Sequence, residues 1–366
     1  METSTFRISN VEFTKTGQAS QVGRSSITVH QIDDLHDSYL RGCSIHHTFN
    51  RAVGLHRVNY LRVQENIIYN VRGHAILLGT GAETKNRIEC NCIVDMRAQS
   101  AILSSDFFPA GIFVQNPDNE VTGNSVAESD AYGIWYHLPE HPELRGTTLD
   151  AGICPRHVTL NKFEGNIAHT NQKDGLVIWP IYDPRAEACT VGTDDWVVAE
   201  FRDFMGYNNG EHGAMAFEVG AVQFVDFKMA NNMLVNVEYS KIVSSLPDDY
   251  AKIVGGWMLG KSPGLMSCLP SLIDAAPNGI VFARDEYFRV INTKFCYYLW
   301  AEEAACLSPC SNCDDDVDND IGAYTTIITN LWYDPATVDH RIRFHPWQTS
   351  IIYDTDSTTT DHADGI

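Results

Sequence analysis

The sequence has few basic residues and no long apolar run. Its 26 Lys and Arg residues are outnumbered by 47 Asp and Glu residues, which gives a formal net charge of −21. A surface of that sign repels nucleic acid and anionic lipid. No stretch reaches the ~18 apolar residues that a membrane-spanning helix needs, and the first residues lack the apolar segment of a signal peptide. We therefore expect neither nucleic-acid binding nor direct membrane insertion.

Glycosylation sequons are absent, and close cysteine pairs are rare. No Asn-x-Ser/Thr triplet occurs, and the ten cysteines are scattered apart from Cys90/Cys92 and Cys310/Cys313. Such a distribution fits either a few disulfides or buried thiols. Cys310 and Cys313 have the spacing of half a zinc site, but no second pair stands at a suitable distance. The alternatives are a local disulfide or a disulfide to Cys306.

What the sequence does contain is a repeat. Residues 41–53 and 69–78 each form an apolar strand that ends in polar residues, and the second follows the first after roughly 23 residues, the length of one solenoid coil. This shift places Arg51 beside His74, and it places Thr28 in the same row one coil earlier. Equivalent side chains of stacked coils lie about 4.8 Å apart. The repeat therefore predicts a polar ladder.

A second pattern extends the repeat along the chain. An Asn is followed about nine residues later by a Gly and a new apolar run, as in Asn124 to Gly133 and Asn166 to Gly175. Asn tolerates the left-handed backbone conformation of a tight turn, and stacked Asn side chains hydrogen-bond along a solenoid axis. The pattern favours a right-handed, single-stranded parallel β-helix of the all-β class. The alternative is an antiparallel β-sandwich, which short strands also suit.

The repeat also predicts how the chain is organised. Pro-, Gly- and acid-rich stretches at residues 104–118, 137–160 and 180–200 indicate loop insertions that wall a groove. We predict one elongated domain over residues 1–358 and a polar tail over 359–366. Because the chain begins directly in strand material, and solenoid ends need caps, we expect a cap or a further domain before residue 1.

Several motifs resemble the β-helix region of the fibrocystin and fibrocystin-like proteins, which is shared with hyaluronidases of the transmembrane-protein-2 and cell-migration-inducing type. The resemblance covers about residues 8–358. It is carried by these stretches: residues 39–53, Gly73-His-Ala75, Gly81-x-Glu83-Thr84, Asn116-Pro-x-Asn119, Tyr132-Gly-Ile-Trp-Tyr136, Glu140-His-Pro142, Asn166-Ile-Ala-His169, Asp174-Gly-Leu176, Phe288-x-Val290-x-Asn292, Cys310-x-x-Cys313, Arg341-Ile-Arg343 and Tyr353-Asp-Thr-Asp356.

The resemblance implies an extracellular or cell-surface location and a module without catalytic activity, which has a structural, adhesive or assembly role. Its partners would be other domains or subunits of a larger extracellular assembly, with glycan or cation binding as a further expectation. A domain of the family's G8 type would precede it. The alternative is a glycan-cleaving hydrolase that acts on hyaluronan-like polysaccharide. Two departures favour the first reading: Thr28 replaces a family His, and Gly79 with Thr80 replaces an acidic pair.

Candidate site residues follow from the ladder and its neighbours. If catalysis occurs, Arg51, His74 and His30 are the candidates for acid–base chemistry. The ladder, a retained acid and two aromatic side chains suited to sugar faces give these candidates for glycan binding: Arg51, His56, His74, Glu83, Trp135 and Tyr136. The competing reading is that the polar groups satisfy turns and that Trp135 and Tyr136 lie in the core.

Calcium is the one cofactor that the sequence suggests. Asp314, Asp316 and Asp318 alternate like the opening of a calcium loop, although Asn319 occupies the position where such a loop has Gly. Asp354 and Asp356 form a second Asp-x-Asp, followed by Ser357 where the family commonly has Gly. The competing interpretation is a solvated acidic loop.

Overall fold

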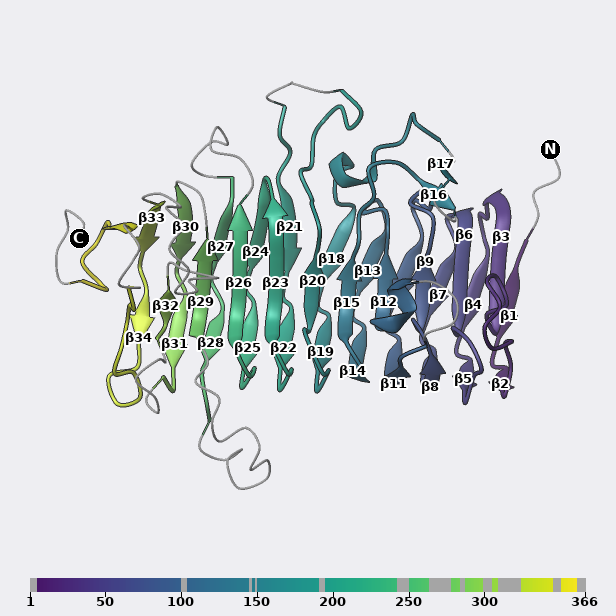
Figure 1. Cartoon of the computed structure of the whole chain (residues 1–366), viewed down its shortest axis with the longest axis horizontal. Coiled ribbons are helices and arrows are strands. Elements are labelled where there is room, and N and C mark those ends of the chain that lie inside the picture. Colours follow the sequence, from purple (N-terminus) through teal and green to yellow (C-terminus); the bar gives the residue numbers. More distant parts are fainter. Residues whose placement is uncertain are drawn as a thin grey trace.

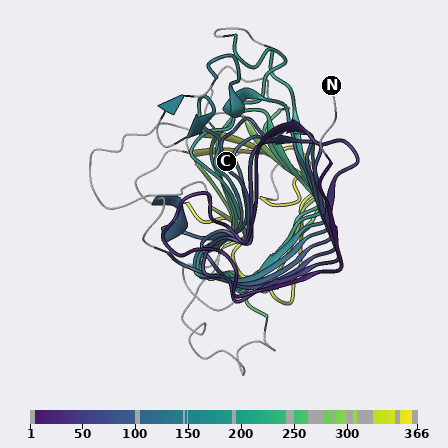
Figure 2. The same cartoon turned by 90° about the vertical axis from the view of Figure 1, so that its right-hand side faces the viewer.

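The computed structural model describes residues 5–99, 104–144, 147–148, 150–190, 195–241, 250–262, 278–283, 287–298, 305–308, 324–344 and 350–360. Three parallel sheets run along an elongated body; among the described residues each coil up to residue 308 contributes one strand to each sheet, and the coils after it contribute to the first two sheets only. Seen from the N-terminal end, the coils superpose into a three-sided tube (Figures 1 and 2). The predicted right-handed parallel β-helix is confirmed, and the β-sandwich is excluded.

The strands of each sheet follow one another in chain order. The first sheet consists of β1 (Arg7–Ser9), β4 (Tyr39–Arg41), β7 (Arg62–Gln64), β10 (Arg87–Glu89), β13 (Glu120–Thr122), β18 (Lys162–Glu164), β21 (Ala199–Arg202), β24 (Val222–Val225), β27 (Lys252–Val254), β30 (Phe288–Ile291), β33 (Tyr324–Thr329) and β35 (Ser350–Asp354). The second consists of β2 (Glu12–Thr14), β5 (Ser44–His46), β8 (Ile67–Arg72), β11 (Cys92–Arg97), β14 (Ser125–Ser129), β19 (Ile167–His169), β22 (Met205–Tyr207), β25 (Lys228–Ala230), β28 (Trp257–Leu259), β31 (Lys294–Cys296) and β34 (Trp332–Tyr333). The third consists of β3 (Ile27–Asp34), β6 (Val53–Asn59), β9 (Ile76–Leu78), β12 (Ala110–Val114), β15 (Tyr132–Tyr136), β20 (Leu176–Ile178), β23 (His212–Val219), β26 (Val235–Lys241), β29 (Asn278–Ala283) and β32 (Leu307–Ser308).

The core is built from side chains that repeat at the same position in every coil. A three-residue strand turns only its middle side chain inward, because successive side chains of a strand point to opposite faces. In the first sheet this inward position is filled along the axis by Leu40, Val63, Ile88, Val121, Phe163, Phe201, Phe224, Ile253, Val290 and Ile328, all buried. Apolar burial of this kind is the main favourable contribution to folding, so the row ties every coil to the next.

Stacked Asn side chains close the turns, as predicted. In one ladder, Asn66, Asn91, Asn124 and Asn166 follow one another, and each side-chain amide donates to the Oδ1 of the next. The left-handed turn residue, however, is not the Asn but the residue before it, such as Glu65 or Cys90. The physical reason is that the Asn side chain has to point inward to join the ladder, so its neighbour makes the turn.

The Gly of the sequence pattern is explained by a second Asn ladder. Asn171, Asn209 and Asn232 are linked amide to amide. A Cβ on Gly175 would lie 2.5 Å from the carbonyl oxygen of Gly213 and 3.0 Å from the Nδ2 of Asn209, and one on Gly213 would lie 2.6 Å from both the Nδ2 of Asn232 and the carbonyl oxygen of Asn236. Because these distances are too short for a carbon atom, the third sheet needs Gly wherever the second ladder passes it.

Inserted segments leave the stack on the side of the third sheet. They include the 3₁₀ turns η1 (Ser104–Phe107) and η2 (Pro155–His157) and the hairpin β16 (Glu143–Leu144) and β17 (Thr147–Thr148). A disulfide joins Cys154 to Cys189. The predicted insertion at residues 104–118 is wrong in extent, because β12 lies within it; Pro109 and Gly111 suggested a loop, but residues 110–114 form a strand that is buried throughout.

No helix among the described residues has the length and apolar character to cross a membrane.

Candidate functional site

The predicted ladder lies on the outer face of the third sheet. Strand β6 pairs with β9 so that Val53 is opposite Ile76, which places Arg51 opposite His74 as expected. His56 likewise lies beside Gly79, whose backbone N–H donates to the carbonyl of Leu55. The predicted pairing of Arg51 with His74 is confirmed.

The position predicted for Thr28 is wrong. Strand β3 pairs with β6 so that Thr28 is opposite Gly54, and His30 is opposite His56. The sequence spacing between paired residues differs between the first and second coils, because the connection from β2 to β3 is longer than the one from β5 to β6. Thr28 therefore does not continue the row of Arg51, and the substitution of a family His at this position does not remove a member of that row.

Arg51 and Asp106 form a buried ion pair. Nε of Arg51 donates to Oδ1 of Asp106 at 2.8 Å, and Nη2 donates to Oδ2. The side chains are 2% and 0% exposed. Asp106 belongs to η1, which lies in the segment between β11 and β12. That segment therefore covers Arg51 and satisfies its charge, so the predicted ladder is a filled contact in this structure.

His74 lies beside this pair and is neutral. Its Nδ1 accepts a hydrogen bond from the backbone N–H of Ala110 at 3.0 Å, so the proton of the neutral ring is on Nε2. Nε2 is 3.8 Å from Oδ1 of Asp106, beyond hydrogen-bond distance, and has no partner. Burial lowers the pKa of His74 to about 3, a shift that Asp106 opposes and Arg51 reinforces. Burial opposes ionisation of Asp106, but the Arg51 guanidinium and a hydrogen bond from the backbone N–H of His74 hold the Asp106 pKa below its ordinary value.

His56 is the second buried histidine of this face. Neither of its ring nitrogens has a hydrogen-bond partner, and its ring centroid is 5.8 Å from that of His30. Burial lowers the pKa of His56 to about 4, with smaller contributions from Arg51 and His30. His56, like His74, is therefore uncharged at neutral pH, whereas His30 is exposed.

These depressed pKa values predict acid destabilisation. Above pH 6.5 both histidines are neutral in the folded and unfolded chain. As the pH falls from 6.5 towards 4, only the unfolded chain takes up their protons, so the free energy of unfolding decreases by up to about 1.4 kcal/mol per pH unit for each histidine. Urea denaturation at a series of pH values measures this slope, and His56→Leu is expected to reduce it by the contribution of one proton. An unchanged slope in His56→Leu would contradict the assignment.

The other glycan-binding candidates are also buried. Glu83 accepts hydrogen bonds from the backbone N–H groups of Thr80, Gly81 and Arg57. Trp135 is 6% exposed and its ring packs against Phe113 at 4.9 Å. Tyr136 points into the core, 5.3 Å from the ring of Phe201. Glu83 therefore acts as a turn cap and Tyr136 as a core residue in this structure, and a role in glycan binding stays a prediction.

The calcium candidates divide into two groups. Asp314, Asp316 and Asp318 lie outside the described residues, as do Cys310 and Cys313. Asp354 is buried and its Oδ2 accepts hydrogen bonds from the backbone N–H groups of Thr359 and Thr360. Asp356 similarly caps the backbone of Asn330 and Thr358. Both carboxylates are thus engaged in turns, and calcium at this place stays a prediction. Cys306 is a buried free thiol, with no disulfide among the described residues.

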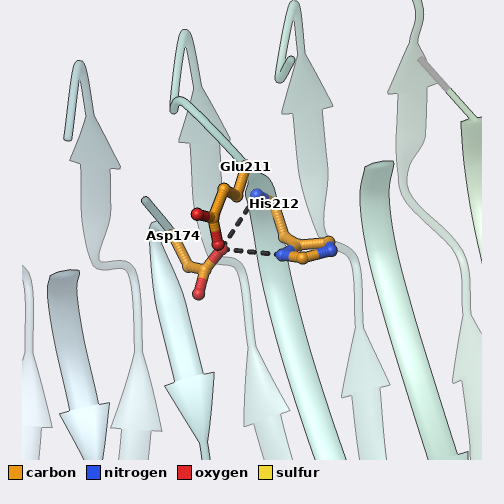
Figure 3. Close-up of side chains that lie close together, drawn as sticks. All are labelled: Asp174, Glu211 and His212. Atoms are coloured by element: carbon orange, nitrogen blue, oxygen red, sulfur yellow. Dashed lines mark hydrogen bonds and ion pairs between the residues drawn. The ribbon is translucent and has the colours of Figure 1, made fainter. Parts of the chain in front are cut away.

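A polar cluster that the sequence reading missed lies further along the same face (Figure 3). Nδ1 of His212 is 2.7 Å from Oδ1 of Asp174, and Nε2 is 2.9 Å from Oε2 of Glu238. Glu211 lies alongside and is paired with Lys173 at 2.5 Å. Burial lowers the pKa of His212, but Asp174 and Glu238 outweigh it and raise the pKa to about 10. Aligning Gly175 with Gly213 would have placed Asp174 beside His212.

Part of the chain matches a family model that is itself described as a β-helix. Residues 1–176 match the family model described as CEMIP beta-helix. Fibrocystin-L from Homo sapiens is 35% identical over 254 residues, which cover 69% of this chain and 6% of that protein. The cell surface hyaluronidase of Danio rerio is 28% identical over 207 residues, 47% of this chain and 15% of that protein. The crystal structure of a mutant periplasmic alginate epimerase, AlgG, aligns with a TM-score of 0.43 at 10% identity, over 88% of this chain and 74% of that one. The chain thus spans a small part of the curated relatives that it matches.

Proposed function

We propose that the chain, whose residues 1–176 match the CEMIP beta-helix family model and which is 35% identical to a region of fibrocystin-L, is a non-catalytic, extracellular β-helix module. The observation that carries the proposal is the buried ion pair of Arg51 and Asp106. An acid–base group has to reach the atom whose proton it transfers, and Arg51 is shielded from solvent by the segment that carries Asp106. His74, beside it, is completely buried.

The remaining polar groups of the candidate site support the same proposal. The carboxylate of Glu83 is engaged by three backbone N–H groups, and Gly79 occupies the position beside His56. Gly79 and Thr80 are the positions at which the resemblance implies an acidic pair. With Glu83 fixed as a turn cap, no described carboxylate among these residues is available to act together with Arg51 or His74.

The extracellular part of the proposal rests on cysteine chemistry and on the relatives. Cys154 and Cys189 form a disulfide within the insertions that cover the third sheet. Disulfides persist mainly in oxidising compartments, which include the cell surface and the extracellular space. One relative is named as a cell surface hyaluronidase. These observations favour a chain that folds in the secretory pathway.

An assembly role is supported by an exposed aromatic row on the second sheet. Trp257, Lys294 and Trp332 occupy the same outward position in successive coils. The two indole rings are 42% and 46% exposed, and the Lys294 ammonium lies 4.7 Å from the ring centre of Trp257. Exposed apolar groups of this kind on a rigid scaffold favour contact with another domain. Since the chain spans 6% of fibrocystin-L, we propose neighbouring domains or subunits as its partners.

Hyaluronidase-like cleavage is the second candidate function. It is favoured by the retained Arg51–His74 pair and by the unpartnered Nε2 of His74 beside an ionised carboxylate. If the segment that carries Asp106 moved away, a guanidinium, an imidazole and a carboxylate would face the solvent together. Such a group has the acid–base and charge-stabilising components that glycan cleavage requires.

An assay of hyaluronan length decides between the two functions. Size-fractionated hyaluronan is incubated with the purified chain in the presence of calcium, with a commercial hyaluronidase as the positive control. Gel electrophoresis is expected to show unchanged hyaluronan for the chain. The control variant is Asn161→Ala, which changes an exposed residue. The non-catalytic proposal would be contradicted if the chain and this control depolymerised hyaluronan and His74→Gln did not.

A further inference from the structure

The cluster around His212 has the composition of a metal site. One ligand atom from each of Asp174, Glu211 and His212 lies within 4.8 Å of the other two (Figure 3). Asp174 precedes β20, and Glu211 and His212 stand at the beginning of β23, so adjacent coils supply the three groups. An imidazole with two carboxylates is a ligand set that occurs at protein-bound zinc and related divalent metals.

The imidazole of His212 is held in the orientation that metal binding needs. Its Nε2 is 2.9 Å from Oε2 of Glu238, while its Nδ1 is directed at the Oδ1 of Asp174. A histidine ligand typically donates its remaining N–H to a carboxylate, which fixes the ring and makes the coordinating nitrogen more basic. Glu238 is in that position, and Nδ1 is therefore the nitrogen that would bind the metal.

Charge and burial at the cluster also favour a cation. Asp174, Glu211 and Glu238 supply three carboxylates against one lysine, Lys173, and the imidazole itself. The side chain of Asp174 is 3% exposed and that of His212 is 12% exposed, so the negative field is weakly screened. The same field attracts a divalent ion.

We propose that Asp174, Glu211 and Nδ1 of His212 bind one divalent transition metal, of which zinc is the best match, and that Glu238 positions the imidazole. Binding replaces the Nδ1 proton, which passes to the buffer, and the three ligands leave at least one coordination position for water or another ligand. Calcium is disfavoured because it takes six to eight oxygen ligands, and this group offers one nitrogen and two carboxylates. The site is independent of Arg51 and His74, so it does not depend on the proposed function.

Metal titration of the whole chain tests the proposal. Zinc is titrated in competition with a chromophoric chelator, and cobalt is used as a spectroscopic probe of the ligand set. We expect His212→Gln to bind one metal equivalent fewer than the natural chain, and Glu238→Gln to bind the same equivalent about 10–100-fold more weakly. His169→Gln is the matched control, because His169 lies in the same coil as Asp174 but is stacked on Tyr207; its binding is expected to be unchanged.

Folding and competing sites are controlled separately. Glu211 lies at the edge of the cluster, 35% exposed, so Glu211→Gln keeps the fold and is expected to weaken zinc binding at least tenfold. Circular dichroism verifies each variant. Equal zinc binding by the natural chain, His212→Gln and Glu211→Gln would overturn the proposal. A cobalt spectrum with thiolate bands alone, or displacement of the zinc by equimolar calcium, would overturn it as well.

Discussion

Replacing Asp106 with Ala is expected to lower the free energy of unfolding by about 3–5 kcal/mol, the usual result of removing one partner of a buried ion pair. The variant leaves the guanidinium of Arg51 buried without the two hydrogen bonds that Asp106 accepts. Desolvation of an unpaired charge, rather than loss of the pair's net stabilisation, accounts for most of the effect. Chemical denaturation followed by circular dichroism measures it.

Two further variants identify the cause of this loss. Asp118→Ala removes the partner of Lys85, whose side chain is 47% exposed, and is expected to change stability by less than about 1 kcal/mol. Adding Arg51→Met to Asp106→Ala removes the buried charge and is expected to restore much of the loss. A decrease below about 1 kcal/mol in Asp106→Ala would show that Arg51 reaches solvent, and would contradict the closed arrangement on which the non-catalytic function rests.

The fold could be predicted because each coil repeats the same physical requirement. A ladder Asn stands at the same turn in successive coils from Asn66 to Asn166, an apolar residue fills the strand centres, and Gly stands where the second ladder passes. These requirements are local, so they leave a period in the sequence. The pairing of Arg51 with His74 followed from that period, because the two coils that carry them have the same length.

The burial and ion pairing of the candidate site could not be predicted in the same way. Asp106 is 55 residues from Arg51 in sequence and enters the site from a segment outside the repeat. The periodicity of the sequence therefore gives no information about where Asp106 lies. The placement of Thr28 was wrong because the first coil has a longer connection. Exposure does not follow from an outward position either, since Trp135 and His74 are buried. The cluster at His212 was missed because it draws on several coils and has no motif of its own.

The Asn ladder gives the second large effect. Asn91→Ala is expected to lower the free energy of unfolding by about 3–5 kcal/mol, since each buried polar group left without a partner costs about 1–3 kcal/mol. The Oδ1 of Asn91 accepts from both the backbone and the side chain of Asn66, and its Nδ2 donates to Val63 and to Asn124. Removal of this one amide therefore leaves donors and acceptors unpaired in the coils on both sides.

A second Asn-to-Ala substitution, outside the ladder, shows whether the loss of stability depends on the ladder position or follows from removing any Asn. Asn161 is exposed, and Asn161→Ala is expected to stay within about 0.5 kcal/mol of the natural chain. Native-state hydrogen exchange adds a local readout, because the backbone N–H of Asn66 bonds to Asn91 and should lose protection in Asn91→Ala. If both variants changed stability equally, the apolar rows alone would hold the coils together. A large loss of stability in Asn91→Ala alone would instead show that the amide ladder fixes the register of the β-helix. The same ladder is the feature that made the fold recognisable in the sequence.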